Sequence, residues 1–246
     1  AAAPAGAPAA PGRWRALAQI TAGYTLLSGY YTAWPQNFVL LVSLPRSAGG
    51  YAFGPHEIGL LQNFSAVGLL VTNVTLYPRL AKSKGFLWCF AAGCLANLAV
   101  TLPLPAYALL ADPGRFGLWR YVPLAFMMFM GQAAAGFCFP TVFVWLNRLA
   151  PMQHKGKING WTNALGALLR SAFPPAMSAL LSLGLRSGVP GGRYLPLLAN
   201  ALAYLGSLAL VARGQRVAAA GLTEPEARAK PPAPGAAELA GRGEAE

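Results

Sequence analysis

Long apolar runs, separated by short polar or glycine- and proline-rich segments, fill most of the chain. No acidic or basic residue occurs between Arg15 and Arg46, and similar runs recur as far as Arg213. A helix that crosses the hydrocarbon of a bilayer needs about 20 predominantly apolar residues. The pattern predicts an all-α membrane protein with six transmembrane helices, at residues 16–44, 58–77, 86–110, 121–146, 158–183 and 194–211.

The two ends of the chain differ in composition from the spans. Residues 1–12 are almost entirely Ala, Pro and Gly, which predicts a linker that arrives from an upstream segment. Residues 214–246 are mixed in charge and rich in the same small residues, which predicts a disordered cytoplasmic tail. The transmembrane domain therefore occupies residues 13–213. Because the chain opens on Ala1 without the layout of a signal peptide, we expect it to be part of a longer protein.

Composition places the protein in a membrane, since 55% of its residues are hydrophobic and only 11% are charged. The net charge of +12 comes from basic residues between the apolar runs and not from a continuous patch, so no nucleic-acid partner is predicted. Cys89, Cys94 and Cys138 lie inside apolar runs without metal-ligand spacing and are expected to be buried thiols. The adjacent His56 and Glu57 lack further ligands, and no metal or cofactor is predicted.

The basic residues also predict the orientation of the spans. Cytoplasmic flanks carry an excess of Lys and Arg. One set of flanks is poor in them and holds Arg46, Arg115, Arg120, Arg186 and Arg193; the richer set, which we expect to be cytoplasmic together with both termini, holds Arg13, Arg15, Arg79, Lys82, Lys84, Arg148, Lys155, Lys157, Arg213 and Arg216. Three crossings are an odd number, so spans one to three and spans four to six have opposite directions, as in inverted repeats. Hydropathy alone fits other six-span proteins equally well.

Two stretches carry a more specific signal. Residues 147–184, NRLAPMQHKGKINGWTNALGALLRSAFPPAMSALLSLG, resemble the segment of major facilitator transporters in which an R-G-x-x-N-G turn enters the eleventh helix. Residues 54–85, with a Y-P-x-L exit and a basic turn, resemble the eighth helix of the zinc-induced-facilitator-like group and its relatives among drug:proton antiporters. The resemblance implies the C-terminal six-helix half of a major facilitator transporter, with two inverted three-helix repeats.

The same resemblance implies partners and a function. The partners are the lipid bilayer, an N-terminal six-helix half, a small solute and protons. The expected activity is secondary active, proton-coupled transport of a small solute, in a vacuolar or plasma membrane. The choice of solute, and of symport or antiport, is left open.

Several residues match the family's motifs. Gly156, Asn159 and Gly160 match the turn, and Arg170 matches the buried basic residue of the helix that follows. Pro175 matches the family's proline, although Phe173-Pro174 stands where an aliphatic residue and Gly are usual. The basic turn, which includes Arg79 and Lys84, lacks the acidic residue of the family's loop motif. We assign gating or turn roles to Gly156, Gly160, Pro175, Arg79 and Lys84.

In that architecture the first, second, fourth and fifth spans line the central path. Gln62 and Asn73 are eleven residues apart and nearly in line on a regular helix. We assign substrate-path roles to Arg170, Asn163, Asn159, Gln62, Asn73 and Tyr31. Each has an alternative. The amides can simply bond a neighbouring helix, Arg170 can pair with the other half and set the gate, and Tyr31 can be a packing residue. Gln132, between small residues, is expected at a close helix contact.

Other functions are less compatible with the sequence. No acidic residue lies inside a predicted span and both histidines lie in loops, which argues against an intramembrane enzyme. A channel would need a ring of like residues or a carbonyl-lined filter, and neither is visible. The remaining alternative is a half-size transporter fragment that has become inactive or structural.

Overall fold

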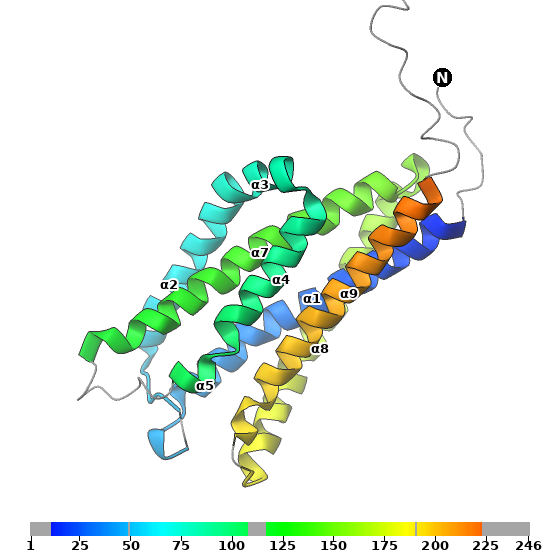
Figure 1. Cartoon of the computed structure of the whole chain (residues 1–246). Coiled ribbons are helices and arrows are strands. Elements are labelled where there is room, and N and C mark those ends of the chain that lie inside the picture. The colour runs from blue at the N-terminus through cyan, green and yellow to red at the C-terminus, as the bar shows by residue number, and fades with distance from the viewer. Residues whose placement is uncertain (1–10, 49, 108–116, 190, 223–246) are drawn as a thin grey trace, which may run out of the picture.

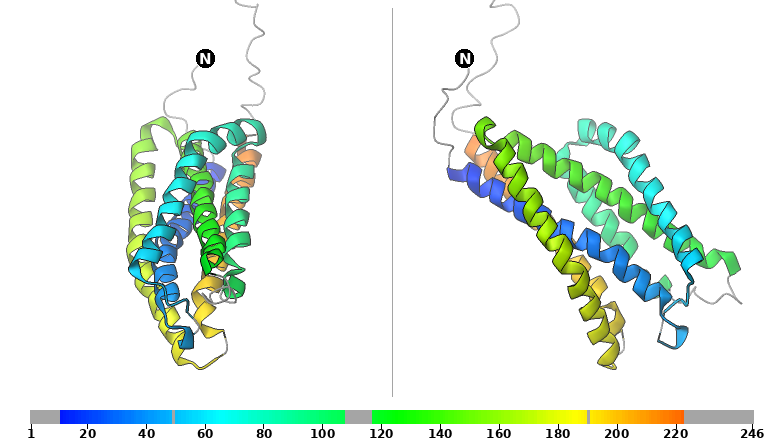
Figure 2. Two further views of the ribbon diagram at one scale, coloured as in Figure 1. Left: turned by 90° about the vertical axis from the view of Figure 1, so that its left-hand side faces the viewer. Right: turned by 180° about the vertical axis from the view of Figure 1, so that it is seen from behind.

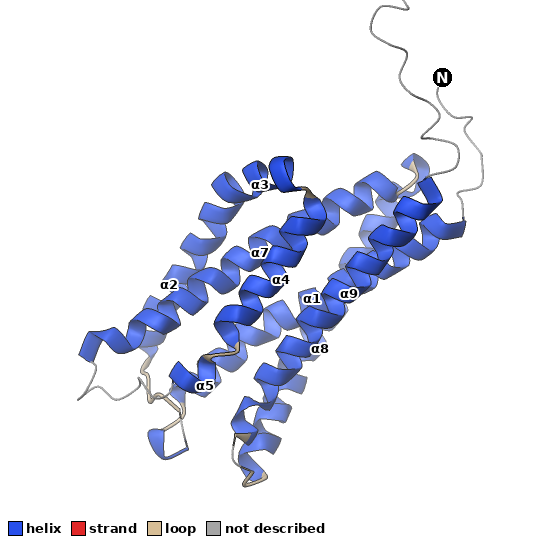
Figure 3. Cartoon of the chain, in the orientation of Figure 1, coloured by secondary structure: helices blue, strands red, loops and turns tan. Residues whose placement is uncertain are grey.

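The computed structural model describes residues 11–48, 50–107, 117–189 and 191–222 (Figure 1). Every regular element in these ranges is helical, and no strand occurs in them (Figure 3). The elements are α1 (Pro11–Ser43), η1 (Arg46–Ala48), α2 (Pro55–Val71), η2 (Thr72–Leu76), α3 (Tyr77–Lys84), α4 (Phe86–Thr101), α5 (Leu104–Tyr107), η4 (Gly117–Tyr121), α7 (Val122–Leu149), η5 (Met152–His154), α8 (Lys155–Arg186), η6 (Gly192–Tyr194) and α9 (Leu195–Leu222). The predicted all-α fold is therefore confirmed for the described part of the chain.

Five helical segments of the described chain are long and apolar enough to cross a membrane: Pro55–Lys84, Phe86–Tyr107, Gly117–Leu149, Met152–Arg186 and Gly192–Ala219. They contain the predicted spans two to six, except for the end of span three. The chain is thus an integral, multi-pass membrane protein. The predicted first span lies in α1, which has sufficient length but is less apolar, because Thr, Ser, Tyr and Gln recur along it.

Some boundaries differ from the sequence-based expectation. The apolar segment of span three continues to Tyr107, but α4 itself ends at Thr101 and a new turn begins at Pro103, whose carbonyl accepts from Ala106 and Tyr107. The predicted end of this span, at residue 110, lies outside the described residues. Helix α9 continues to Leu222, so the start of the expected tail is helical, and α1 begins inside the expected linker. Residues 1–10, 108–116 and 223–246 lie outside the described residues.

The second span also continues beyond its predicted end. We expected it to end at Tyr77, before Pro78, but the helix runs through the proline into α3. Pro78 has no backbone N–H and its ring clashes with the carbonyl four residues earlier. A wider π-helical turn, η2, precedes it, and there the Tyr77 N–H donates to the Thr72 carbonyl five residues back. The wider turn accommodates the proline without ending the helix.

The long helices form two groups, visible as two diverging layers in Figure 2. Helix α1 packs against α8 and α9, and α7 packs against α2 and α4. Contacts between α1 and α7, and between α4 and α9, join the groups. The first helix of each expected three-helix unit therefore packs against the second and third helices of the other unit.

Two buried clusters hold the bundle together. One is centred on Tyr24, Phe90 and Trp145, and the other on Phe38 and Leu104. The three cysteines are free thiols buried between helices, as predicted. The clusters lie towards opposite ends of α1, so apolar packing runs along its length.

The connections between helices, the start of α1 and the end of α9 are distributed over the two ends of the bundle. The start of α1, the α3–α4 connection, the α7–α8 connection and the end of α9 gather at one end (Figure 1). These segments carry the richer set of basic flanks. The opposite end carries η1, η4 and η6.

Candidate functional site

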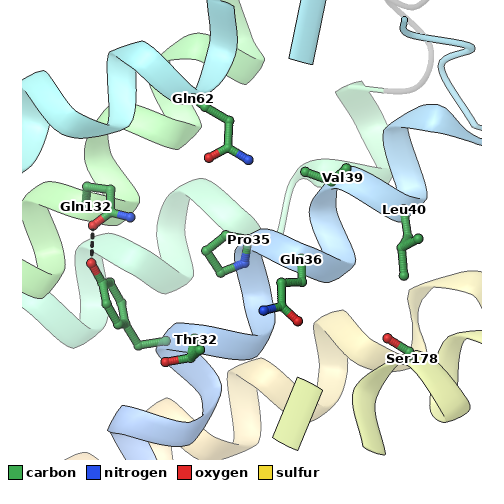
Figure 4. Close-up of a pocket in the computed structure, with 9 residues that line it drawn as sticks. Thr32, Pro35, Gln36, Val39, Leu40, Gln62, Gln132 and Ser178 are labelled. Atoms are coloured by element: carbon green, nitrogen blue, oxygen red, sulfur yellow. Dashed lines mark hydrogen bonds between the residues drawn. The ribbon is translucent and has the colours of Figure 1, made fainter. Parts of the chain in front are cut away.

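An open cavity of about 680 Å³ lies between four of the helices. Its lining comes from α1, α2, α7 and α8, and none of it comes from α4 or α9. Figure 4 shows Gln62, Gln132 and Gln36 around this space, with Ser178 facing it from α8. The lining residues are Tyr31, Thr32, Pro35, Gln36, Val39, Leu40, Gln62, Gln132 and Ser178.

The cavity combines apolar walls with uncharged polar groups. Three amides and three hydroxyls face it, and none of the nine lining residues carries a charge. An amide both donates and accepts hydrogen bonds, and a hydroxyl does the same. A largely apolar concave site with a few such groups can orient a small polar molecule.

Tyr31 and Gln132 connect α1 to α7 across the inner wall of the cavity. The Tyr31 hydroxyl donates to Gln132 Oε1, and the Tyr31 ring packs edge-on against Phe139 with 4.9 Å between ring centroids. The structure thus places the predicted residue Tyr31 at the cavity. Gln132, which we expected only at a close helix contact, also lines it. The available signal was that Gln132 is the sole amide within the predicted span four.

Arg170 lies beside the cavity lining but is not part of it. Its Nη1 donates to Ser28 Oγ at 2.9 Å and lies 3.5 Å from the Tyr24 hydroxyl. The Tyr24 hydroxyl in turn donates to Asn163 Oδ1 at 3.4 Å. The half-buried guanidinium thereby joins α8 to α1 through neutral groups, and no carboxylate of the described residues pairs with it.

The remaining substrate-path residues are distributed differently. Gln62 lines the cavity, whereas Asn73 is exposed and lies next to Gly136 of α7. Asn159 Nδ2 donates to Asn147 Oδ1 at 3.0 Å, near the α7–α8 connection. The structure therefore brings Tyr31 and Gln62 to the cavity and Arg170 and Asn163 to one cluster, and it leaves Asn73 and Asn159 apart from both.

The residues assigned to gating or turn roles lie at the surface of the described chain. Gly156 and Gly160 are within the first turns of α8, because the chain reverses earlier, between Pro151 and His154. The turn that was expected at these glycines therefore lies a few residues earlier in the chain, directly after α7. Pro175 is exposed within α8, which continues through it, and Arg79 and Lys84 are exposed on α3.

One polar cluster escaped the sequence analysis. Glu57, at the start of α2, accepts from Arg120 Nη2 at 2.6 Å, from the Gly54 backbone N–H at 2.7 Å and from the Tyr121 hydroxyl. Arg120 also lies over the Phe53 ring at 5.2 Å. The cluster ties the start of α2 to the start of α7. A Gly-Pro-x-Glu sequence at a helix start is the available signal, since the glutamate reaches back to the N-cap.

Comparisons with known proteins give a distant relationship. No family model matches the chain, and no solved structure matches it. A probable peptide/nitrate transporter of Arabidopsis thaliana is 26% identical over 170 residues, which are 69% of this chain and 34% of that protein. The chain is a distant relative of a transporter. It spans about a third of that relative's length, and the relationship supports a part in membrane transport.

Proposed function

We propose that this chain is the C-terminal six-helix half of a major facilitator transporter of the zinc-induced-facilitator-like and drug:proton antiporter group. The observation that carries the proposal is the origin of the cavity lining. It comes from α1, α2, α7 and α8, the four helices expected to line a central path, while α4 and α9 supply none of it. In this proposal α1 also crosses the membrane, which brings the five apolar segments to six spans.

Two features of the fold support two inverted repeats with both termini in the cytoplasm. The first helix of each three-helix unit packs against the other unit: α1 contacts α8 and α9, and α7 contacts α2 and α4. The two units therefore make equivalent contacts. The richer set of basic flanks lies at the end of the bundle where α1 begins and α9 ends (Figure 1). An excess of Lys and Arg marks the cytoplasmic side.

The transported solute occupies the cavity and forms hydrogen bonds with its amides and hydroxyls. Because the Arabidopsis relative is a probable peptide/nitrate transporter, peptides and nitrate are the first solutes to test. An N-terminal six-helix half covers the open side of the cavity, and the two halves rock around the solute. The membrane is vacuolar or plasma membrane.

Proton coupling depends on residues of the N-terminal half. Glu57 is the sole carboxylate among the described residues, and it is engaged at the end of the bundle, away from the cavity. Arg170 offers its remaining N–H donors to a carboxylate of the N-terminal half or to an anionic group of the solute.

The experiment is uptake by the full-length transporter in proteoliposomes, with nitrate and a dipeptide as probes and an imposed pH gradient. Gln62→Leu should raise the half-saturating concentration of the transported probe about two- to thirteenfold, because one hydrogen bond contributes about 0.5–1.5 kcal/mol. Gln215→Leu makes the same change on the outer helix α9 and should leave uptake unchanged. Equal uptake by wild type and Gln62→Leu would contradict the assignment of the cavity. Absence of gradient-driven uptake of both probes would contradict the proposed activity on these solutes.

A further inference from the structure

A second, much smaller cavity lies behind the Tyr31–Gln132 hydrogen bond. Its volume is about 20 Å³, and its lining comes from α1, α4, α7 and α9. Tyr31, Pro35 and Gln132 line both cavities. The Tyr31–Gln132 hydrogen bond therefore joins two residues of the lining that the two cavities share.

Asn97, which lines the small cavity, carries a buried acceptor without a donor. Asn97 of α4 is 2% exposed and lines the cavity, and its Oδ1 is buried without a hydrogen-bond partner among the described residues. Buried side-chain acceptors are nearly always satisfied by the protein or by ordered water. The unpaired oxygen therefore indicates a donor that the described residues do not supply.

Two further groups face the same space. Gln132 uses Oε1 to accept from Tyr31, which leaves its two N–H donors available. Tyr204 of α9 is 3% exposed, and its hydroxyl forms no hydrogen bond within the described part of the chain. A buried water needs a polar site with two to four partners and at least about 10–15 Å³ of space. The cavity meets both conditions for one water molecule.

We propose that a single water molecule is bound at Asn97, behind the Tyr31–Gln132 hydrogen bond. The water donates to Asn97 Oδ1, and the Gln132 amide and the Tyr204 hydroxyl supply its other partners. Opening of the Tyr31–Gln132 hydrogen bond connects this site to the large cavity. The water site rests on the geometry of the bundle and does not depend on transport.

Two methionines of α7 report on this water. Met127 and Met128 line the small cavity although they are only 1% and 5% exposed. Met177 of α8 is equally buried, at 3%, and lines neither cavity, whereas Met152 is 83% exposed. Hydroxyl radicals generated from water by X-rays oxidise methionine sulfur close to where they form. Oxidation of Met127 and Met128 therefore tests for the water. Met177 gives the reference rate of a buried methionine, and Met152 gives that of an exposed one.

The experiment is X-ray hydroxyl-radical footprinting of residues 1–246 in lipid nanodiscs, read out by mass spectrometry. Met127 or Met128 should be oxidised several-fold faster than Met177 and more slowly than Met152. Asn97→Leu removes the acceptor and fills the cavity, so it should abolish the excess oxidation without changing Met152. Asn200→Leu is the matched control, since Asn200 is a fully buried amide on α9 that lines neither cavity; it should preserve the excess.

Each outcome decides the proposal. Oxidation of both Met127 and Met128 at the level of Met177 in the wild-type chain would mean that the cavity is dry, and this comparison needs no variant. Excess oxidation that persists in Asn97→Leu would mean that Asn97 does not hold the water. If the faster oxidation of Met127 or Met128 were lost in Asn200→Leu as well, its loss in Asn97→Leu would reflect a general change in the bundle. That result would overturn the proposed water site.

Discussion

Arg170 carries a charge at a depth where a charge is costly. Fifteen residues of α8 precede it, which at about 1.5 Å per residue place it roughly 22 Å from the start of the helix. Insertion scales put the cost of an arginine near the centre of a span at about 2.5–3.5 kcal/mol. Ser28 and Tyr24 satisfy part of its hydrogen-bonding capacity but supply no negative charge. In the proposed function, its remaining donors bind a solute or a carboxylate of the N-terminal half.

In the proposed function, replacing Arg170 with alanine should therefore weaken transport without preventing insertion. A hydrogen bond to a charged group contributes about 1.5–3 kcal/mol, so Arg170→Ala should reduce uptake by the full-length transporter about tenfold to a hundredfold. The measurement is uptake normalised to the amount of protein in the membrane. Arg186→Ala, at the far end of α8, is the matched control. Wild-type uptake by Arg170→Ala would remove this residue from the mechanism.

Polar residues that share a helix face within a predicted span were the useful signal in the sequence. This signal identified Gln62 and Tyr31, which the structure places at the cavity. It did not identify Thr32, Gln36 or Ser178, because polar residues are frequent in these spans and only assembly of the four helices shows which of them share a space. Glu57 was considered only as a weak metal ligand beside His56, because its partner Arg120 lies 63 positions away in the sequence.

At the scale of the element, Asn73 does not continue at the cavity the polar stripe that was expected to start at Gln62. The alignment of residues eleven apart assumes a regular helix of 3.6 residues per turn. Asn73 lies within η2, where the turn is wider, and it is exposed beside α7 instead of lining the cavity. A proline five residues further on gave a warning of irregular geometry, but hydropathy cannot predict whether the helix ends or widens there.

Helices α2 and α7 approach closely at Gly68. A Cβ at this position would lie 2.2 Å from the Phe129 carbonyl oxygen, which belongs to backbone and cannot move away alone. Gly68→Ala should therefore destabilise the bundle by about 1–3 kcal/mol and lower the midpoint of thermal unfolding of the purified chain.

Gly59 provides the matched control on the same helix. A Cβ built there meets no heavy atom of the described residues within 4 Å. Gly59→Ala should leave the midpoint unchanged or raise it slightly, because alanine is favoured over glycine in helices by about 0.5–1 kcal/mol. Equal midpoints for the two variants would show that α2 and α7 do not pack as the structure has them.

At the scale of the whole molecule, the burial of the helices is uneven. Within an apolar stretch of 18 residues in the segments that contain α8 and α2, only 17% and 22% of the residues are buried, compared with 44–50% for the corresponding stretches of the other three segments. In the proposed function these two helices, together with α1 and α7, face the N-terminal half. Hydropathy predicted where the spans lie but not which helices pack together, because an apolar run contains no information about its packing partner.

The proposed position of the cavity predicts which side chains meet water, and this prediction differs from the one that side-chain exposure alone would give. Ser178 and Thr32 line the cavity and are only partly exposed, whereas Leu202 on α9 and Leu95 on α4 are 62% and 54% exposed on the outer helices. If the cavity is a watery solute path and the outer helices face lipid, the less exposed pair is the one that meets water.

Cysteine labelling of the full-length transporter in membranes tests this claim most directly. The native Cys89, Cys94 and Cys138 are replaced by alanine, and single cysteines are introduced at positions 178, 32, 202 and 95. Ser178→Cys and Thr32→Cys should react with a membrane-impermeant thiol reagent, and Leu202→Cys and Leu95→Cys should not. Labelling of the α9 and α4 positions with no labelling at the cavity would contradict the account.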